Sequence, residues 1–180
     1  IGKNLVNTIL SNNGYTVYDL GKQVPINTIV DKAIAVEADA IGLSALLVST
    51  SKQMPLTVQE LSRRGLDIPV LIGGAAINRR FGRRALFVDD AGTPYAGGVY
   101  YCRDAFEGLD AVEQVIDPPR RAALYERMVD EARRDTFLNQ TAEERAAPAA
   151  GVEFKKVGAA PDIPSPPFWG WRVLENVPLD

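Results

Sequence analysis

The first part of the chain alternates between two hydrophobic patterns. Across residues 1–13 and 27–37, apolar side chains recur every three or four positions, which predicts amphipathic helices. Across residues 15–20, 40–46 and 69–72, β-branched, aromatic and aliphatic side chains follow one another, which predicts strands, the last two of them buried on both faces. Helix and strand therefore alternate along this region.

The same patterns continue to about residue 135. They predict two further strand-like segments and four further helices, at residues 86–88 and 98–102 and at residues 55–64, 78–84, 105–115 and 118–134. Alternation of this kind is typical of a parallel sheet covered by helices on both faces. We therefore predict the α/β class, with a doubly wound, flavodoxin-like or Rossmann-like sheet. Such a sheet would have a strand before the first helix, so we expect the natural protein to continue upstream of Ile1, and its first strand to be missing here.

Composition changes after residue 135. Residues 136–163 contain many alanines, several prolines and no sustained periodicity, and we predict a linker there. Residues 164–180 become apolar again and include Trp169 and Trp171, so we expect them to begin, or lead into, another domain. We therefore predict one domain over residues 1–135, followed by a linker and a junction.

Overall composition narrows the class of protein. The chain has 180 residues, of which 46% are hydrophobic and 24% charged, and its net charge of −3 argues against a nucleic-acid partner. Its apolar runs are too short to span a bilayer, so we predict no membrane partner. It has no histidine, which excludes Ser-His-Asp chemistry and histidine metal sites within these residues. A single cysteine, Cys102, favours the reducing cytoplasm.

Candidate binding residues follow the predicted strands. Ligands of open α/β sheets bind at the carboxyl ends of the strands. Ser44 and Leu46 lie at the end of one predicted strand, Gly73 and Gly74 at the end of the next, and Gly2 at the start of the first helix. Small residues and hydroxyls there suit a flat, largely apolar ligand with a few polar atoms. Each feature also has an ordinary explanation: a turn for the glycine pair, a helix cap for the hydroxyls that follow Leu46, and close packing for Gly2.

The spacing of these residues is more specific than any one of them. There are 41 residues between Gly2 and Ser44, and 26 between Leu46 and Gly73. This order resembles the pattern Asp-x-His-x-x-Gly, Ser-x-Leu, Gly-Gly of cobalamin-binding domains. The local sequence is similar to the cobalamin module of cobalamin-dependent methionine synthase. The similar segments are IGKNLV at 1–6, Val24-Pro25, DAIGLS at 39–44 and PVLIGGA at 69–75. The tail is similar too, with PPFWG at 166–170 and VPLD at 177–180. The Asp-x-His half of the first motif is not in this sequence.

The resemblance implies a binding role for each matching residue around a cofactor whose nucleotide tail is drawn away from cobalt. Ser44 would bond the nucleotide base and Leu46 would line its slot, while Gly73 and Gly74 would let the tail pass. A histidine of the missing half-motif would bind cobalt from below, and no residue here can take that place.

Four more positions complete the site that the resemblance implies. Thr50 matches a hydroxyl of the family's histidine–aspartate–hydroxyl relay, and Val48 would make an apolar or backbone contact. Asp104 and Ala105 match contacts to the far side of the tail. Gly2 is what remains of the first motif. The resemblance assigns no catalytic and no metal-ligating residue within this chain.

The function implied is that of a methyl carrier in a multi-domain methyltransferase. Methylcobalamin would move a methyl group from 5-methyltetrahydrofolate to homocysteine, with the homocysteine, folate and reactivation domains as partner modules and with zinc and S-adenosylmethionine only on those modules. The alternatives are a corrinoid protein of another methyltransferase, the cobalamin domain of a mutase, or a cofactor-free regulatory α/β domain. The last would have carboxylates at the strand ends, where Asp19 is one but Ser44 and Gly73 are not.

Overall fold

The computed structural model describes residues 2–146, with side chains described as far as residue 135. These residues belong to a first compact unit, which ends at Ala146, and the second unit covers residues 147–180. The junction predicted at 164–180 and most of the predicted linker lie outside the described residues. The domain boundary near residue 135 stays a prediction.

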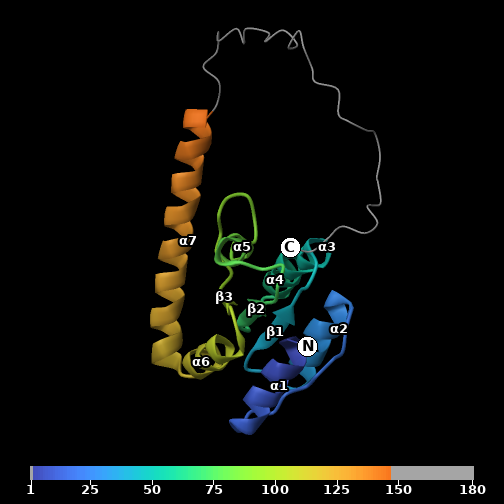
Figure 1. The fold of residues 1–180 in the computed structure, drawn as a ribbon. Helices are drawn as coiled ribbons and strands as arrows, with labels where there is room; N and C mark the ends of the chain where they lie inside the picture. The colour runs from blue at the N-terminus through green and yellow to red at the C-terminus, as the bar shows by residue number, and fades with distance from the viewer. Residues whose placement is uncertain (1, 147–180) are drawn as a thin grey trace, which may run out of the picture. The chain divides into compact units, whose positions relative to one another are not determined.

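Three parallel strands form the centre of the first unit (Figure 1). They are β1 (Ile41–Ser44), β2 (Val70–Gly73) and β3 (Val99–Tyr101), in the order β1-β2-β3. Ile41 lies opposite Val70, which in turn lies opposite Val99. Apolar runs make these strands because both faces of the sheet are covered by helices. The α/β class with a parallel sheet is confirmed.

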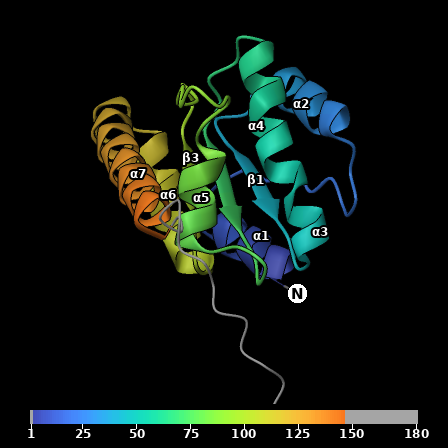
Figure 2. The same ribbon diagram turned by 90° about the horizontal axis from the view of Figure 1, so that it is seen from above.

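Helices cover the two faces of this sheet (Figure 2). On one face lie α2 (Ile26–Ala35), α4 (Gln53–Arg63) and α5 (Arg79–Ala85). On the other lie α1 (Gly2–Asn12) and α6 (Ala105–Val115), which contact each other. The remaining helices are the short α3 (Val48–Ser51) and the long α7 (Pro118–Ala146), which packs against α5 and α6.

The hydrophobic core has two parts because successive residues of a buried strand point to opposite faces. Val70 and Ile72 pack with α2, α4 and α5, whereas Leu71 between them packs with α6. The larger cluster includes the fully buried side chains of Val30, Val58, Leu61 and Leu86. Both clusters hold the sheet rigid and fix where its strand ends lie.

The outer edge of β1 has no paired strand among residues 2–146. The amides of Ile41 and Ala45 donate to carbonyls on the β2 side, to Pro69 at 2.8 Å and to Gly73 at 3.1 Å. Backbone groups alternate in direction along a strand, so those of Gly42 and Ser44 face away from β2. Residues 15–20, predicted as a strand, are extended but unpaired, and that prediction is wrong for this structure because a strand needs a neighbour to complete its ladder.

Three other predictions need correction. The predicted strand at 86–88 is a turn after α5, with one antiparallel bridge between Phe87 and Pro94. The strand predicted over 40–46 ends at Ser44, because Leu47 begins the turn into α3. The helix predicted over 118–134 continues to Ala146, into the region assigned to the linker, since residues 138–146 are mostly good helix formers and the next proline is Pro148.

An arginine of α5 holds α7 in place. The guanidinium of Arg83 donates to Glu131 at 2.8 Å and also to Asp135. These two bonds keep Arg83 charged, and they raise the pKa of its guanidinium. The contact therefore fixes the angle at which α7 leaves the domain.

Replacing Arg83 by methionine is expected to lower the free energy of unfolding by about 1 kcal/mol, because two charge-assisted bonds are lost while the packing of the stem is kept. The measurement is the urea midpoint of the purified chain. The control is Arg84→Met, an exposed neighbour on the same helix. Equal midpoints for the two variants would contradict the role of Arg83.

Candidate functional site

The carboxyl ends of the three strands form one edge of the sheet. The amide of Ala45 donates to the carbonyl of Gly73 at 3.1 Å, and that of Cys102 donates to Ile72 at 2.9 Å. Figure 2 shows the arrowhead of β1, helix α3 and the start of α1 on the same side of the molecule. We call this region the carboxyl edge; it comprises residues 44–50, 73–74 and 102–106 and the first turn of α1.

Two glycines lie at the centre of the carboxyl edge. A Cβ at Gly73 would come within 2.8 Å of the carbonyl oxygen of Cys102. Gly74 has φ of +109°, and a Cβ there would come within 2.3 Å of the carbonyl oxygen of Ala45. Both glycines therefore have a packing reason that operates without a ligand. They let the carboxyl ends of β1, β2 and β3 approach one another closely. We call the backbone atoms exposed there the floor of the carboxyl edge.

Apolar side chains surround this floor but face solvent. Leu46 is 77% exposed, Leu47 58% and Val48 71%, and they follow β1, of which Ile41 is buried and Ser44 is exposed. Phe106, in the first turn of α6, is 71% exposed. Exposed apolar groups in sequence at the end of a strand mark a binding surface more often than an ordinary surface. We call Leu46, Leu47 and Val48 the apolar rim.

Hydroxyl groups stand beside the apolar rim. Ser44 ends β1 and is exposed. The hydroxyl of Thr50 donates to the carbonyl of Leu47 at 2.8 Å, and that of the buried Ser51 donates to Val48 at 2.8 Å. With its proton bound to Leu47, Thr50 can only accept a further hydrogen bond. A hydroxyl retains acceptor lone pairs in that state.

Gly2, the first residue of α1, is exposed. A Cβ there would meet nothing within 4 Å among the described atoms. Packing within the described part of the chain therefore gives no reason for a glycine at this position. This contrasts with Gly73 and Gly74 and leaves the first turn of α1 open to a ligand.

Asp104 begins α6 by capping it. Its Oδ1 accepts the amides of Phe106 and Glu107, each at 3.0 Å, and the Glu107 carboxylate accepts the amide of Arg103 at 2.8 Å. This arrangement is a variant of the capping box, because Glu107 accepts the amide of the residue before the cap and not that of the cap itself. The amide of Glu107, then that of Phe106, holds the pKa of Asp104 below its ordinary value of 3.8 despite some desolvation. Ala105, the first residue of α6, is buried. The structure thus gives Asp104 a helix-capping role that sequence reasoning missed.

The Asp104 cap should change how the stability of the fold depends on pH in acid solution. A carboxylate with a lowered pKa stabilises the fold fully above its ordinary pKa, and this contribution is lost as pH falls through the lowered value. Asp104→Ala is therefore expected to lower the urea midpoint more at pH 7 than near pH 2, where a protonated carboxyl still offers a neutral accepting oxygen. Asp104→Asn, which keeps an accepting oxygen, should lie between Asp104→Ala and the unchanged chain. A deficit of equal size at both pH values would contradict the assignment.

Two features of the edge escaped prediction. The exposure of Leu47 and Phe106 has no sequence signal that separates it from burial. The carbonyl of Cys102 beside Gly73 carries no sequence signal at all. Burial raises the pKa of the Cys102 thiol to about 12, so it stays protonated and unreactive at neutral pH.

Within residues 2–135, no three side chains of His, Cys, Asp or Glu gather to hold a metal ion. Within the described helices, none combines the length and the apolar character needed to cross a bilayer. The carboxyl edge is therefore an apolar and hydroxyl-bearing surface with no metal cluster of its own side chains in the described region.

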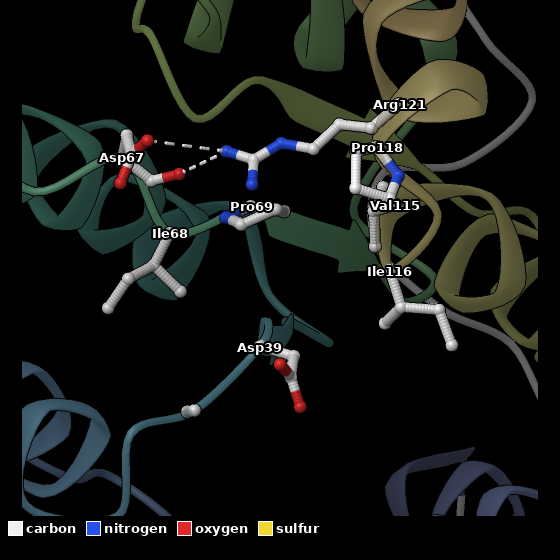
Figure 3. A pocket seen from close by; sticks show the side chains of 9 residues that line it. Asp39, Asp67, Ile68, Pro69, Val115, Ile116, Pro118 and Arg121 are labelled. Atoms are coloured by element: carbon white, nitrogen blue, oxygen red, sulfur yellow. Dashed lines mark hydrogen bonds and ion pairs between the residues drawn. The ribbon is translucent and has the colours of Figure 1, made fainter.

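The two cavities that we describe lie away from the carboxyl edge. One, of about 270 Å³, lies at the amino ends of β1 and β2, where Arg121 of α7 donates to the carbonyl of Asp67 at 2.5 Å (Figure 3). The other, of about 470 Å³, lies between α2 and α4 beside Leu56. A closed channel between neighbouring strands, which the resemblance implies for a nucleotide tail, is not among them. The carboxyl edge is an open surface instead.

Comparisons with known proteins show the family to which the chain belongs. Residues 1–99 match the family model described as B12 binding domain. The chain belongs to the B12-binding domain family, and the match supports cobalamin as its cofactor. Within that class it is similar to one part of methionine synthase: it is 36% identical over 192 residues to the enzyme of Mycobacterium tuberculosis and 36% identical over 196 residues to that of Mycobacterium leprae.

Coverage limits what these relatives imply. The matches include 98% of this chain but only 16% of either methionine synthase, so the chain corresponds to about a sixth of those enzymes. Among solved structures, a cobalamin-binding protein from Desulfitobacterium hafniense matches with a TM-score of 0.56 and 31% identity, over 65% of this chain and 52% of the other. The fold and the family are therefore shared, whereas the activity of the whole enzyme is a matter for proposal.

The carboxyl edge fits a cobalamin in chemical character. A corrin carries a large apolar surface ringed by amides, and the apolar rim offers exposed leucine and valine side chains beside hydroxyls. Gly73 and Gly74 let the backbone at Cys102 and Ala45 approach the end of β2 closely, so main-chain atoms form the surface there. The sequence contains no histidine that could act as a ligand to cobalt.

Proposed function

We propose that this chain is the cobalamin-carrying module of a methionine synthase, which holds methylcobalamin while a methyl group passes from 5-methyltetrahydrofolate to homocysteine. One observation carries the proposal: similarity to methionine synthases extends over 98% of the chain, far beyond the 1–99 segment that the B12-binding family model matches. Other modules of such an enzyme would bind the two substrates.

The bound cobalamin supplies the chemistry, because its cobalt accepts a methyl group and gives it up. The protein supplies position. Leu46 and Val48 are exposed, and they would cover apolar surface of the cofactor and exclude water from it. Gly73 and Gly74 allow the strand ends to approach one another, and this backbone is where the nucleotide tail would lie.

Polar groups of the edge fix the orientation of the cofactor. Ser44 donates to or accepts from the nucleotide base at the end of β1. The Thr50 hydroxyl donates to the carbonyl of Leu47 at 2.8 Å. To join a relay with an ionised carboxylate, which can only accept, Thr50 would release Leu47 and donate to that carboxylate instead. Asp104 acts through α6, whose first turn it caps beside the exposed Phe106.

The competing proposals make different demands on the same edge. A corrinoid protein of another methyltransferase would use the same surface, but the likeness over residues 100–180 favours methionine synthase. A cofactor-free regulatory domain would need carboxylates at the strand ends. The ends of β1 and β2 instead carry Ser44 and Gly73, beside the exposed apolar rim.

The test uses the complete natural protein, loaded with methylcobalamin and desalted. Retention of the cofactor is read from its visible absorbance, and methionine is measured after homocysteine and 5-methyltetrahydrofolate are added. We expect stoichiometric cofactor and repeated turnover. Cofactor retention without methionine would move the proposal to another methyltransferase, and a colourless protein would favour the regulatory domain.

A further inference from the structure

An ion pair ties the start of α1 to the segment before α2. The ammonium of Lys3, in the first turn of α1, donates to both carboxylate oxygens of Asp19, at 2.5 Å to Oδ2. Asp19 also accepts the amide of Gly21 at 2.8 Å. The two side chains come from segments that share no strand ladder in the described structure, so this bond is a side-chain link between them in addition to the contacts around Leu10 and Tyr15.

Lys3 stands where a lysine does not help its own helix. The amino end of a helix carries a partial positive charge, so a cation in the first turn is unfavourable. No acidic residue of α1 offsets it there. Asp19 supplies the negative charge from outside the helix, and the Lys3 bond is the main reason that the pKa of Asp19 is lowered. The pair therefore serves a contact between segments rather than the helix itself.

Packing holds α1 mainly along its body and its far end. The helix contacts α6, and its side chain in a core cluster is Leu10, while no residue of α1 in the described structure is buried. At the end that reaches the carboxyl edge and contains Gly2, the bond between Lys3 and Asp19 adds a contact from outside the helix (Figure 2).

We propose that Lys3 and Asp19 form a positioning clamp that sets the first turn of α1 at the carboxyl edge for cobalamin binding. The two residues act through the backbone around Gly2 and need not touch the cofactor. This inference rests on the proposed function, because it assigns a role at the same site. Its consequence is that cofactor affinity depends on a charge pair that is open to solvent.

An ordinary surface ion pair is the competing explanation. The Lys3 and Asp19 side chains are 38% and 34% exposed, and pairs of this kind contribute about 0–1 kcal/mol to folding. Such a pair would change stability slightly and cofactor affinity not at all. The two explanations therefore separate when stability and affinity are measured on the same variants.

The experiment measures methylcobalamin affinity of the complete natural protein by equilibrium dialysis with visible absorbance. Lys3→Met and Asp19→Asn each remove the charge attraction, and asparagine keeps an oxygen for the Gly21 amide. At low salt we expect each to weaken binding by about three- to tenfold. Lys3→Arg should bind as the unchanged protein does. The exchanged pair, Lys3→Asp with Asp19→Lys, should recover most of the loss.

Salt gives a readout that simple loss of packing would not move. Because the clamp is partly exposed, about 1 M salt screens it within a few ångströms, so the affinity of the unchanged protein should fall toward that of Asp19→Asn. The matched control is Asp31→Asn, which breaks another ion pair between segments, that of Arg64 with Asp31 at 2.5 Å. Its methylcobalamin affinity should equal that of the unchanged protein.

Failure of this inference differs from failure of the proposed function. If the unchanged protein binds methylcobalamin and both single variants bind it equally well, the clamp is wrong and the carrier proposal stands. If affinity falls but the exchanged pair recovers nothing and salt has no effect, the clamp is also wrong, because charge attraction is then not the cause. If the unchanged protein does not bind methylcobalamin, the proposed function fails first.

Discussion

Replacing Gly74 by alanine is expected to lower the free energy of unfolding by about 3 kcal/mol or more and to abolish methylcobalamin uptake. Two costs combine at this position. A side chain at φ of +109° strains the backbone, and its Cβ would lie 2.3 Å from the carbonyl oxygen of Ala45, which is a backbone atom that cannot rotate away. A domain of this size is stable by only about 5–15 kcal/mol, so the loss is large.

Urea denaturation of the cofactor-free chain measures the first effect, and retention of methylcobalamin in the complete natural protein measures the second. Gly92→Ala is the matched control, because Gly92 has φ of +79° with open space around it. It carries the backbone strain alone, expected to cost about 1 kcal/mol, and should leave uptake unchanged. If Gly74→Ala were no less stable than Gly92→Ala, the close approach of β1 and the Gly73-Gly74 turn would be disproved.

Replacing Leu46 by aspartate should weaken methylcobalamin binding at least tenfold while leaving the cofactor-free fold intact. Leu46 is 77% exposed, so its loss should change the free energy of unfolding by less than about 0.5 kcal/mol. In the complex, the variant would forgo the burial of a leucine side chain, which is worth about 1.5–3 kcal/mol, and would place a carboxylate against apolar surface.

Equilibrium dialysis and urea midpoints on the same protein test this pair of expectations. Leu56→Asp is the control, since Leu56 is also an exposed leucine, 45% exposed, but lies at the groove between α2 and α4. Its methylcobalamin affinity should not change. Equal losses in the two variants would mean that the apolar rim does not contact the cofactor.

The sequence predicted the elements whose signal is local. The parallel core strands at β2 and β3 and helices α2, α4, α5 and α6 appear within a few residues of their predicted bounds, because each has its own apolar period and its own terminating residues. The structure adds that Asn78 and Asp104 cap α5 and α6, as small polar residues do before a helix. These features need no knowledge of distant contacts.

The errors arise where the answer depends on a partner. Residues 15–20 have strand composition, yet a strand exists only if another backbone pairs with it, and the described residues provide none. The segment 86–88 is equally apolar, but Leu86 is buried in the turn that closes α5, where packing needs no ladder. Local pattern does not distinguish these outcomes.

The candidate site shows the same division. Gly73 and Gly74 were found from a glycine pair after a strand, and the structure adds the atoms that forbid any larger residue, Cys102 and Ala45. Exposure of Leu46, Leu47 and Val48 could not be read from an apolar run that looks like a core strand. The hydrogen bond from Thr50 to Leu47 is one that only coordinates reveal.

The outward backbone groups of Gly42 and Ser44 have a practical consequence for work with this chain in isolation. Within residues 2–146 no strand pairs with the outer edge of β1, and an unpaired strand edge is a template for pairing with another molecule. The exposed apolar side chains of Leu46 and Leu47, which follow β1, would strengthen such an association. Solutions of the isolated 180 residues should therefore be kept dilute, and a solubilising charge near this strand is the first remedy against self-association.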